Sequence, residues 1–195
     1  MKQNSDFRSE FIKNGFVVIK SIYSRQKIMN LRDKMINIAN LEKEILTDKD
    51  VQDLVLNKTL IAKIKELLNA NKLLYYSDSA IVNHQNPFSS KNGFHNDERG
   101  EDLSVPYNQE YPILRVGIYF ENFKYFSGGL KIKKGSHKHF CFNFRDIKTN
   151  LIKLIKIFIS KTRYNLNSIR LGKSINLELE EGDIVIWNLR TIHCG

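Results

Sequence analysis

The feature that most constrains the fold is a change in hydrophobic period near residue 71. Before it, apolar residues recur at three- and four-residue spacing, which is typical of amphipathic helices. After it, short runs rich in β-branched and aromatic residues are separated by glycine-containing turns. Because turns rather than helical crossovers join these runs, the strands are expected to pair antiparallel. The pattern therefore predicts a mainly β fold with flanking helices, of the α+β class, built as a sandwich or barrel.

The elements can be placed along the chain. We expect a short helix from residue 7, a turn at Asn14-Gly15, a strand over 16–19, and helices over about 24–41, capped by Ser24, and 51–69. Strands are predicted over 73–82, 113–120, 130–133, 174–180 and 184–187. A further helix is expected over about 147–161, lying across a sheet, with a membrane-surface helix as the alternative. No linker is visible, so we expect a single domain over 1–195, with N-terminal helices over about 1–70 and strands over about 71–195.

Composition excludes several classes of protein. The chain has 195 residues, of which 42% are hydrophobic, enough for a real core. No apolar run approaches the roughly 18 residues that a membrane-spanning helix needs. The polar N-terminus lacks the apolar segment of a secretory signal, and Cys141 and Cys194 do not make a disulfide framework. We therefore expect a cytoplasmic protein without a membrane partner.

The net charge of +10 arises from 31 basic against 21 acidic residues. The excess is mostly lysine and is scattered along the chain, whereas a nucleic-acid footprint gathers on one face with arginine or aromatic partners. We attribute the charge to composition and expect no nucleic-acid partner. Attraction of an anionic substrate stays open.

Three residues form a candidate metal site. His95 and Asp97 are two positions apart, so in extended backbone their side chains project to one side. His193 follows the strand predicted over 184–187. Two histidines and one carboxylate have the composition of the facial triad that holds non-haem iron(II) and leaves positions open, whereas a structural zinc site usually has a closed shell with cysteines. A hydrogen-bonded His-Asp pair at a strand end is the alternative for His95 and Asp97.

Four segments in order resemble the phytanoyl-CoA dioxygenase family of iron(II)- and 2-oxoglutarate-dependent oxygenases. They are FIKNGFVVIKSIYSRQKIMNLR from residue 11, the H-x-D at His95 and Asp97, GGLKIKKGSHK from residue 128, and EGDIVIWNLRTIHCG from residue 181. The resemblance implies a double-stranded β-helix, that is a cupin-like jelly roll, with the metal at its open end. Within the third segment, Lys134 stands where the family usually has proline, and His137 is expected to make a structural hydrogen bond. His84 and His139 have no motif support.

The resemblance also implies the chemistry. His95, Asp97 and His193 match the family's catalytic iron ligands, with Fe(II), O2 and the cosubstrate 2-oxoglutarate as cofactors. The expected reaction hydroxylates a small organic molecule and decarboxylates 2-oxoglutarate to succinate. The Asp97 carboxylate favours hydroxylation over the halogenation of related enzymes, which carry a small residue there.

One departure concerns the cosubstrate. The family holds the far carboxylate of 2-oxoglutarate with an arginine beyond the distal histidine, and this sequence stops at Gly195, so we expect it to be truncated. Arg190 and Arg115 are the candidates for that role within the chain, because guanidinium binds carboxylate bidentately. A cupin-like metal isomerase or sugar-binding module and a catalytically inactive binding protein are the alternatives. The sequence does not name the substrate or the oligomeric state.

Overall fold

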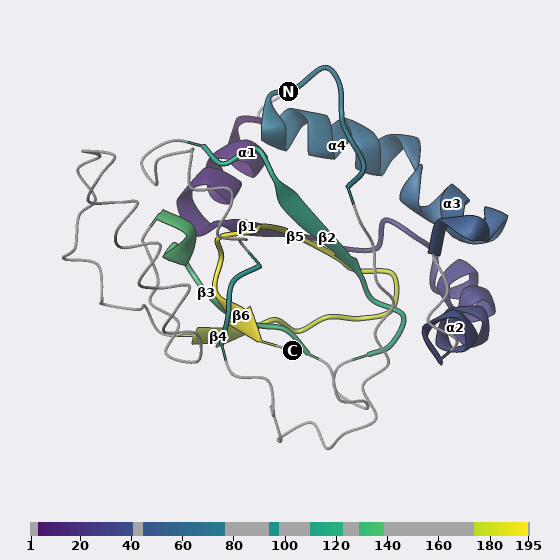
Figure 1. Ribbon diagram of the computed structural model, residues 1–195. Helices are drawn as coiled ribbons and strands as arrows, with labels where there is room; N and C mark the ends of the chain where they lie inside the picture. Colours follow the sequence, from purple (N-terminus) through teal and green to yellow (C-terminus); the bar gives the residue numbers. More distant parts are fainter. Residues whose placement is uncertain are drawn as a thin grey trace, which may run out of the picture.

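The computed structural model describes residues 4–40, 45–76, 94–97, 110–122, 129–138 and 174–194. They form two small antiparallel sheets with helices beside them, as Figure 1 shows. The α+β class predicted from the sequence is confirmed. The helix predicted over 147–161 lies outside the described residues.

The first sheet joins distant parts of the chain. Its strands are β1 (Phe16–Ile19), β5 (Ile184–Asn188) and β2 (Leu114–Ile118), in the order β1-β5-β2 with β5 in the centre. In the register, Trp187 of β5 lies opposite Phe16 on one side and Arg115 on the other. The second sheet has the order β4-β3-β6, formed by β4 (Ser174–Asn176), β3 (Lys131–Lys133) and β6 (His193–Cys194).

The central strand β5 of the first sheet is buried on both faces. Ile184 and Ile186 of β5 belong to a cluster with the helices. Val185 and Trp187 point the other way and pack with Ile132 of the second sheet. Successive side chains of a strand alternate between faces, which explains why the apolar run 184–187 has no polar positions. The layers are therefore helices, first sheet and second sheet.

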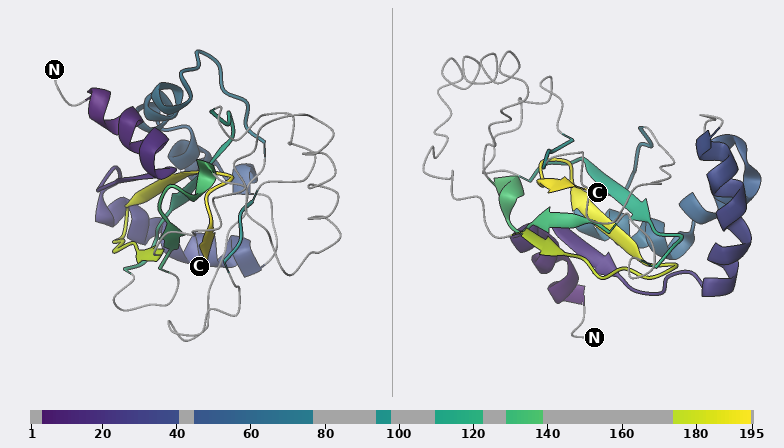
Figure 2. Two further views of the ribbon diagram at one scale, coloured as in Figure 1. Left: turned by 90° about the vertical axis from the view of Figure 1, so that its left-hand side faces the viewer. Right: turned by 90° about the horizontal axis from the view of Figure 1, so that it is seen from below.

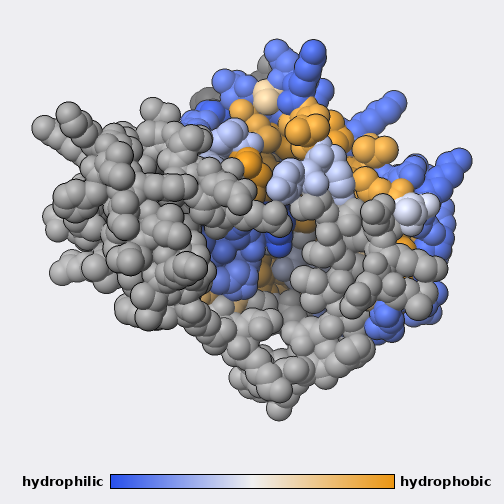
Figure 3. All heavy atoms as spheres, viewed as in Figure 1, coloured by the Kyte–Doolittle hydropathy of each residue, from blue (hydrophilic) through white to orange (hydrophobic). Residues whose placement is uncertain are grey.

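The helices cover the face of the first sheet that is turned away from the second sheet. They are α1 (Asn4–Asn14), α2 (Arg25–Asn40), α3 (Lys49–Val55) and α4 (Lys58–Leu68), with 3-10 turns η1 (Ile45–Thr47) and η3 (Ser136–Lys138). α1 and α4 lie over the sheet, and α2 and α3 gather at one end (Figures 1 and 2). Hydrophilic side chains project from the α4 edge of the face in Figure 3, and apolar ones lie below them toward the sheet.

Three expected elements differ from the structure. The strand predicted over 174–180 is shorter than expected, because β4 ends at Asn176. The helix predicted over 51–69 is broken into α3 and α4, because Asn57 caps α4 by accepting hydrogen bonds from the backbone N–H groups of Thr59 and Leu60. The first part of the strand predicted over 73–82 is not a strand: residues 73–76 have no regular structure, and Leu74 is 91% exposed. The rest of that prediction lies outside the described residues. Within the described chain, no helix is both long enough and apolar enough to span a bilayer.

Candidate metal centre

A short backbone bridge brings the two predicted histidines together. The N–H of His95 donates to the His193 carbonyl at 2.9 Å, and the N–H of His193 donates to the His95 carbonyl at 2.8 Å. Two residues further on, the N–H of Asp97 donates to the carbonyl of Leu189 at 2.9 Å. The segment 94–97 therefore runs antiparallel to the end of the chain, and its alternating side chains place His95 and Asp97 on the same side.

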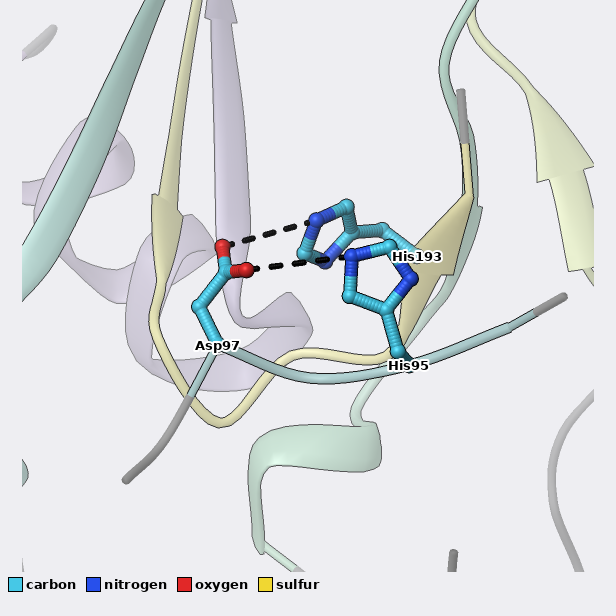
Figure 4. Close-up of side chains that lie close together, drawn as sticks. All are labelled: His95, Asp97 and His193. Carbon is cyan, nitrogen blue, oxygen red and sulfur yellow. Dashed lines mark ion pairs between the residues drawn. The ribbon is translucent and has the colours of Figure 1, made fainter. Parts of the chain in front are cut away.

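The three side chains point toward one another (Figure 4). Asp97 Oδ2 lies 3.5 Å from His193 Nε2, and Asp97 Oδ1 lies 3.8 Å from His95 Nε2. One potential ligand atom from each residue lies within 4.8 Å of the other two. Neighbouring ligands of an ion with bonds of about 2.1 Å are about 3 Å apart, so a small inward movement suffices to enclose one.

The ring of His193 has a defined orientation. Its Nδ1 lies 2.9 Å from the carbonyl oxygen of Thr191, which can only accept, so Nδ1 carries the proton and donates. The lone pair is then on Nε2, the atom that faces Asp97. Burial lowers the pKa of the His193 imidazole below its usual value, which favours the neutral ring. A neutral imidazole with its second nitrogen bonded to a carbonyl is the form that binds metals.

The turn that leads to His193 is held by Gly15, in the turn before β1, and by Ser136 of η3. The Thr191 hydroxyl donates to the carbonyl of Gly15 at 2.8 Å, and the N–H of Ile192 donates to Ser136 Oγ at 2.8 Å. The N–H of Asn188 also donates to Gly15 O, at 2.9 Å. These contacts fix the backbone from which the His193 ring projects.

The donor set fits a ferrous ion. Two imidazoles and one carboxylate form the facial triad of non-haem iron sites, with positions left open for other ligands. Asp97 Oδ2 is buried and accepts no hydrogen bond from the part of the chain that the structure describes. Such an atom costs free energy unless a ligand satisfies it, and a cation between the three side chains would do so.

The structure separates the two candidate arginines. Arg115 Nη1 lies 3.4 Å from Asp97 Oδ2, beside the cluster. Arg190 is 1% exposed, and its guanidinium lies 4.2 Å from the centre of the Tyr111 ring. Spacing along the sequence could not make this distinction, because it depends on which face of each segment is buried.

For other residues near the cluster, sequence analysis provided weaker indications of a role or none. His137 makes the predicted structural contact, with Nε2 3.0 Å from the Ile12 carbonyl oxygen. The Trp187 ring centre lies 5.3 Å from that of His193, a proximity that sequence analysis missed. The pattern Thr191-x-His193 could have suggested a carbonyl partner for the histidine, but only the turn geometry shows it. His84, His139 and Cys141 lie outside the described residues.

Comparison of sequences finds no match among known protein families or curated proteins. Comparison of structures finds non-haem iron enzymes. SnoK, a non-haem alpha-ketoglutarate-dependent carbocyclase from nogalamycin biosynthesis, is 14% identical with a TM-score of 0.59, over 97% of this chain and 76% of its own.

Two further structures are similar. The epimerase SnoN, solved with Fe3+, alpha-ketoglutarate and nogalamycin RO, is 10% identical with a TM-score of 0.59, over 98% of this chain and 76% of its own. AviO1 from Streptomyces viridochromogenes Tue57 is 13% identical with a TM-score of 0.53, over 100% of this chain and 88% of its own. At these identities the comparisons establish a shared fold.

Proposed function

We propose that this protein is an iron(II)- and 2-oxoglutarate-dependent dioxygenase that hydroxylates a small organic substrate. The observation that carries the proposal is the convergence of His95, Asp97 and His193 with their ligand atoms within 4.8 Å of one another. The proposal is supported by the fold shared with SnoK, which is alpha-ketoglutarate-dependent, and with SnoN, which was solved with alpha-ketoglutarate bound.

The protein's own residues have defined tasks in this proposal. His95, Asp97 and His193 would hold the ion with three ligand atoms, and its other positions would remain available to further ligands. When bound, iron(II) with 2-oxoglutarate and dioxygen supplies oxidation of a substrate C–H bond, coupled to decarboxylation of 2-oxoglutarate to succinate. The Thr191 carbonyl keeps His193 Nε2 directed at Asp97, where the ion would bind, and the packed ring of Trp187 beside His193 would limit the access of water from that side.

Hydroxylation is our choice among the outcomes that such a centre can produce. SnoK is described as a carbocyclase and SnoN as an epimerase, so proteins with this fold differ in outcome. Asp97 keeps a carboxylate where a halogenating relative has a small residue. The fold by itself does not choose among reactions.

We also propose that the two described sheets belong to one jelly roll within a single domain. Both sheets contribute to one apolar cluster, with Phe16, Val185 and Trp187 from the first and Ile132 from the second. Two facing antiparallel sheets with one core are the layers from which a jelly roll is built.

The test is anaerobic titration of the protein with iron(II) and 2-oxoglutarate, followed by aerobic assay of succinate. We expect a weak visible charge-transfer band and iron-dependent succinate formation. Both are lost in His95→Ala and Asp97→Asn, because each removes a ligand. Asp50→Asn is the matched control, since it removes an exposed carboxylate on α3.

Each negative result points to a different class. Metal binding without the band and without succinate would favour the metal isomerase. If the protein does not bind metal, or if Asp97→Asn binds metal as fully as the wild type, the alternative of a catalytically inactive binding protein is favoured. Succinate formation that persists after chelation of metal would also contradict the proposal.

A further inference from the structure

Arg115 is an exposed residue of the edge strand β2, at the margin of a largely apolar face. It lies on β2 directly opposite Trp187 of β5, and cross-strand partners project from the same face of a sheet. That face is turned toward the second sheet and is otherwise lined by the apolar cluster that contains Phe16 and Val185. Arg115 therefore places a positive charge beside this apolar cluster, within reach of solvent.

The contact that Arg115 makes is loose. Nη1 lies 3.4 Å from Asp97 Oδ2, and that oxygen still lacks a hydrogen bond from the described chain. Guanidinium has five N–H donors in a planar fork, and among the described residues Arg115 uses one nitrogen in its ion pair with Asp97. The Arg115 side chain is 43% exposed, so a ligand can reach the remaining donors from solvent.

Binding of a metal ion by the cluster would make the site more positive and so favour binding of an anion. A divalent ion held by two neutral imidazoles and the Asp97 carboxylate leaves a net charge of about +1, and Arg115 beside the same carboxylate raises it to about +2. Two cations that share one carboxylate repel each other. An anion that touches both the open side of the ion and the guanidinium removes that repulsion.

We propose that Arg115 receives a carboxylate group of the molecule that occupies the open metal positions. Guanidinium pairs with carboxylate bidentately, which fits its free donors. The inference rests on the proposed function in that the carboxylate is taken to belong to 2-oxoglutarate. That molecule has two, one beside the keto group and one at the far end, and the experiment distinguishes them.

Arg190 does not compete for this role. It is 1% exposed, its guanidinium lies over the Tyr111 ring, and its backbone N–H donates to Asn188 Oδ1 at 2.9 Å. These contacts give it a part in the turn that precedes His193.

The experiment measures ligand binding to the Mn(II)-loaded protein, which needs no turnover. Trp187 is the only tryptophan in the sequence and lies against His193, so its fluorescence reports on the site. The ligands are 2-oxoglutarate, 2-oxovalerate, which lacks the far carboxylate, and succinate, which lacks the keto group. The variants are Arg115→Gln, Arg115→Lys and the control Arg25→Gln. Arg25 pairs with Glu181, which precedes the start of β5, whereas Trp187 lies near the other end of that strand.

In Arg115→Gln we expect 2-oxoglutarate to bind about tenfold more weakly, the loss of one partly exposed charge-assisted pair. Arg115→Lys keeps the positive charge but not the planar guanidinium, so its affinity for 2-oxoglutarate should lie between those of the wild type and Arg115→Gln. Arg25→Gln should bind 2-oxoglutarate like the wild type. Mn(II) should bind Arg115→Gln as tightly as the wild type or more tightly, because a repelling charge is gone. A merely structural role would weaken Mn(II) binding instead.

The outcomes separate the two proposals. Loss confined to 2-oxoglutarate assigns Arg115 to the far carboxylate, and equal loss with 2-oxovalerate assigns it to the near one. Unchanged 2-oxoglutarate affinity in Arg115→Gln, or joint loss of Mn(II) and ligand, overturns the inference. If the wild type binds succinate with the same affinity as 2-oxoglutarate, the proposed function fails. The role of Arg115 in binding a carboxylate is then tested by whether Arg115→Gln weakens succinate binding.

Discussion

His193 is held at three points that depend on different neighbours. Its ring donates to the Thr191 carbonyl, its backbone pairs with His95, and the preceding N–H, that of Ile192, is bound by Ser136. A metal ligand fixed in this way loses little freedom when an ion binds, which favours tight and specific coordination. The contribution of Ser136 can be measured separately because its side chain does not touch the cluster.

Ser136→Ala should lower both stability and metal affinity. The hydroxyl accepts from Ile192 N–H at 2.8 Å and donates to the Lys133 carbonyl at 2.7 Å, in a buried setting. Leaving the N–H unsatisfied costs about 1–3 kcal/mol of the free energy of unfolding. The measurements are denaturant unfolding followed by Mn(II) titration.

Ser24→Ala is the control for this prediction. Its hydroxyl accepts from Lys27 N–H at 3.3 Å at the exposed start of α2, and losing such a cap costs about 1 kcal/mol. It should leave Mn(II) affinity unchanged. Equal Mn(II) affinities in the two variants would mean that Ser136 does not help to position His193.

The sequence could nominate His95 and Asp97 because a two-residue spacing in extended backbone determines a shared side. It could nominate His193 only through its place after a strand and through the family resemblance. The position of Arg115 beside Asp97 depended on the register of β2 with β5, which connects residues far apart in the chain. No local pattern encodes that register.

At the scale of elements, the turn between α1 and β1 links the helical layer to the candidate metal centre. Gly15 has a φ of +84°, and its carbonyl accepts from Asn188 N–H and from the Thr191 hydroxyl. A Cβ on Gly15 would lie 2.6 Å from Thr191 Oγ1 and 2.3 Å from His137 Nδ1. The turn therefore needs glycine for its conformation and also for the space that Thr191 occupies.

Gly15→Ala should destabilise the protein more than Gly135→Ala and should weaken metal binding. Gly135 also has a positive φ, +75°, but a Cβ there would meet only the Lys13 carbonyl oxygen, at 3.7 Å. Positive φ costs an alanine about 1–2 kcal/mol at either position, and overpacking adds about 1–3 kcal/mol at Gly15. Denaturant unfolding and Mn(II) titration of both variants measure the difference, and similar losses would refute the role of Thr191 crowding.

The elements that the sequence predicted well are those with a long or strongly apolar pattern. β1, β2, β5 and α2 fall close to their predicted bounds because their periods are set by burial. The division between α3 and α4 was missed because Asn57 interrupts the helix without disturbing the apolar stripe. Residues 73–76 have strand-like composition, but composition does not supply a pairing partner.

At the scale of the whole molecule, the candidate centre connects segment 94–97, which lies outside the apolar clusters, to the end of the described chain. The backbone of segment 94–97 bonds to His193 and Leu189, and its side chains contact Arg115 and Lys133, while Phe94 is 40% exposed. The central strand β5 of the first sheet, by contrast, is buried on both faces. An ion bound by His95, Asp97 and His193 would fasten the weaker segment to β6.

Metal ions should therefore raise the stability of the folded protein. A ligand at a hundredfold excess over its dissociation constant adds about 2.7 kcal/mol, which for a chain of this size raises Tm by about 5–10 °C. Thermal unfolding followed by circular dichroism, with Mn(II) and then with added EDTA, measures the gain. Asp97→Asn should lose most of it because the carboxylate supplies the charge that holds the ion, whereas Asp50→Asn should keep it. If Asp97→Asn is stabilised by Mn(II) as much as Asp50→Asn, the ion binds elsewhere and these three residues are not its ligands.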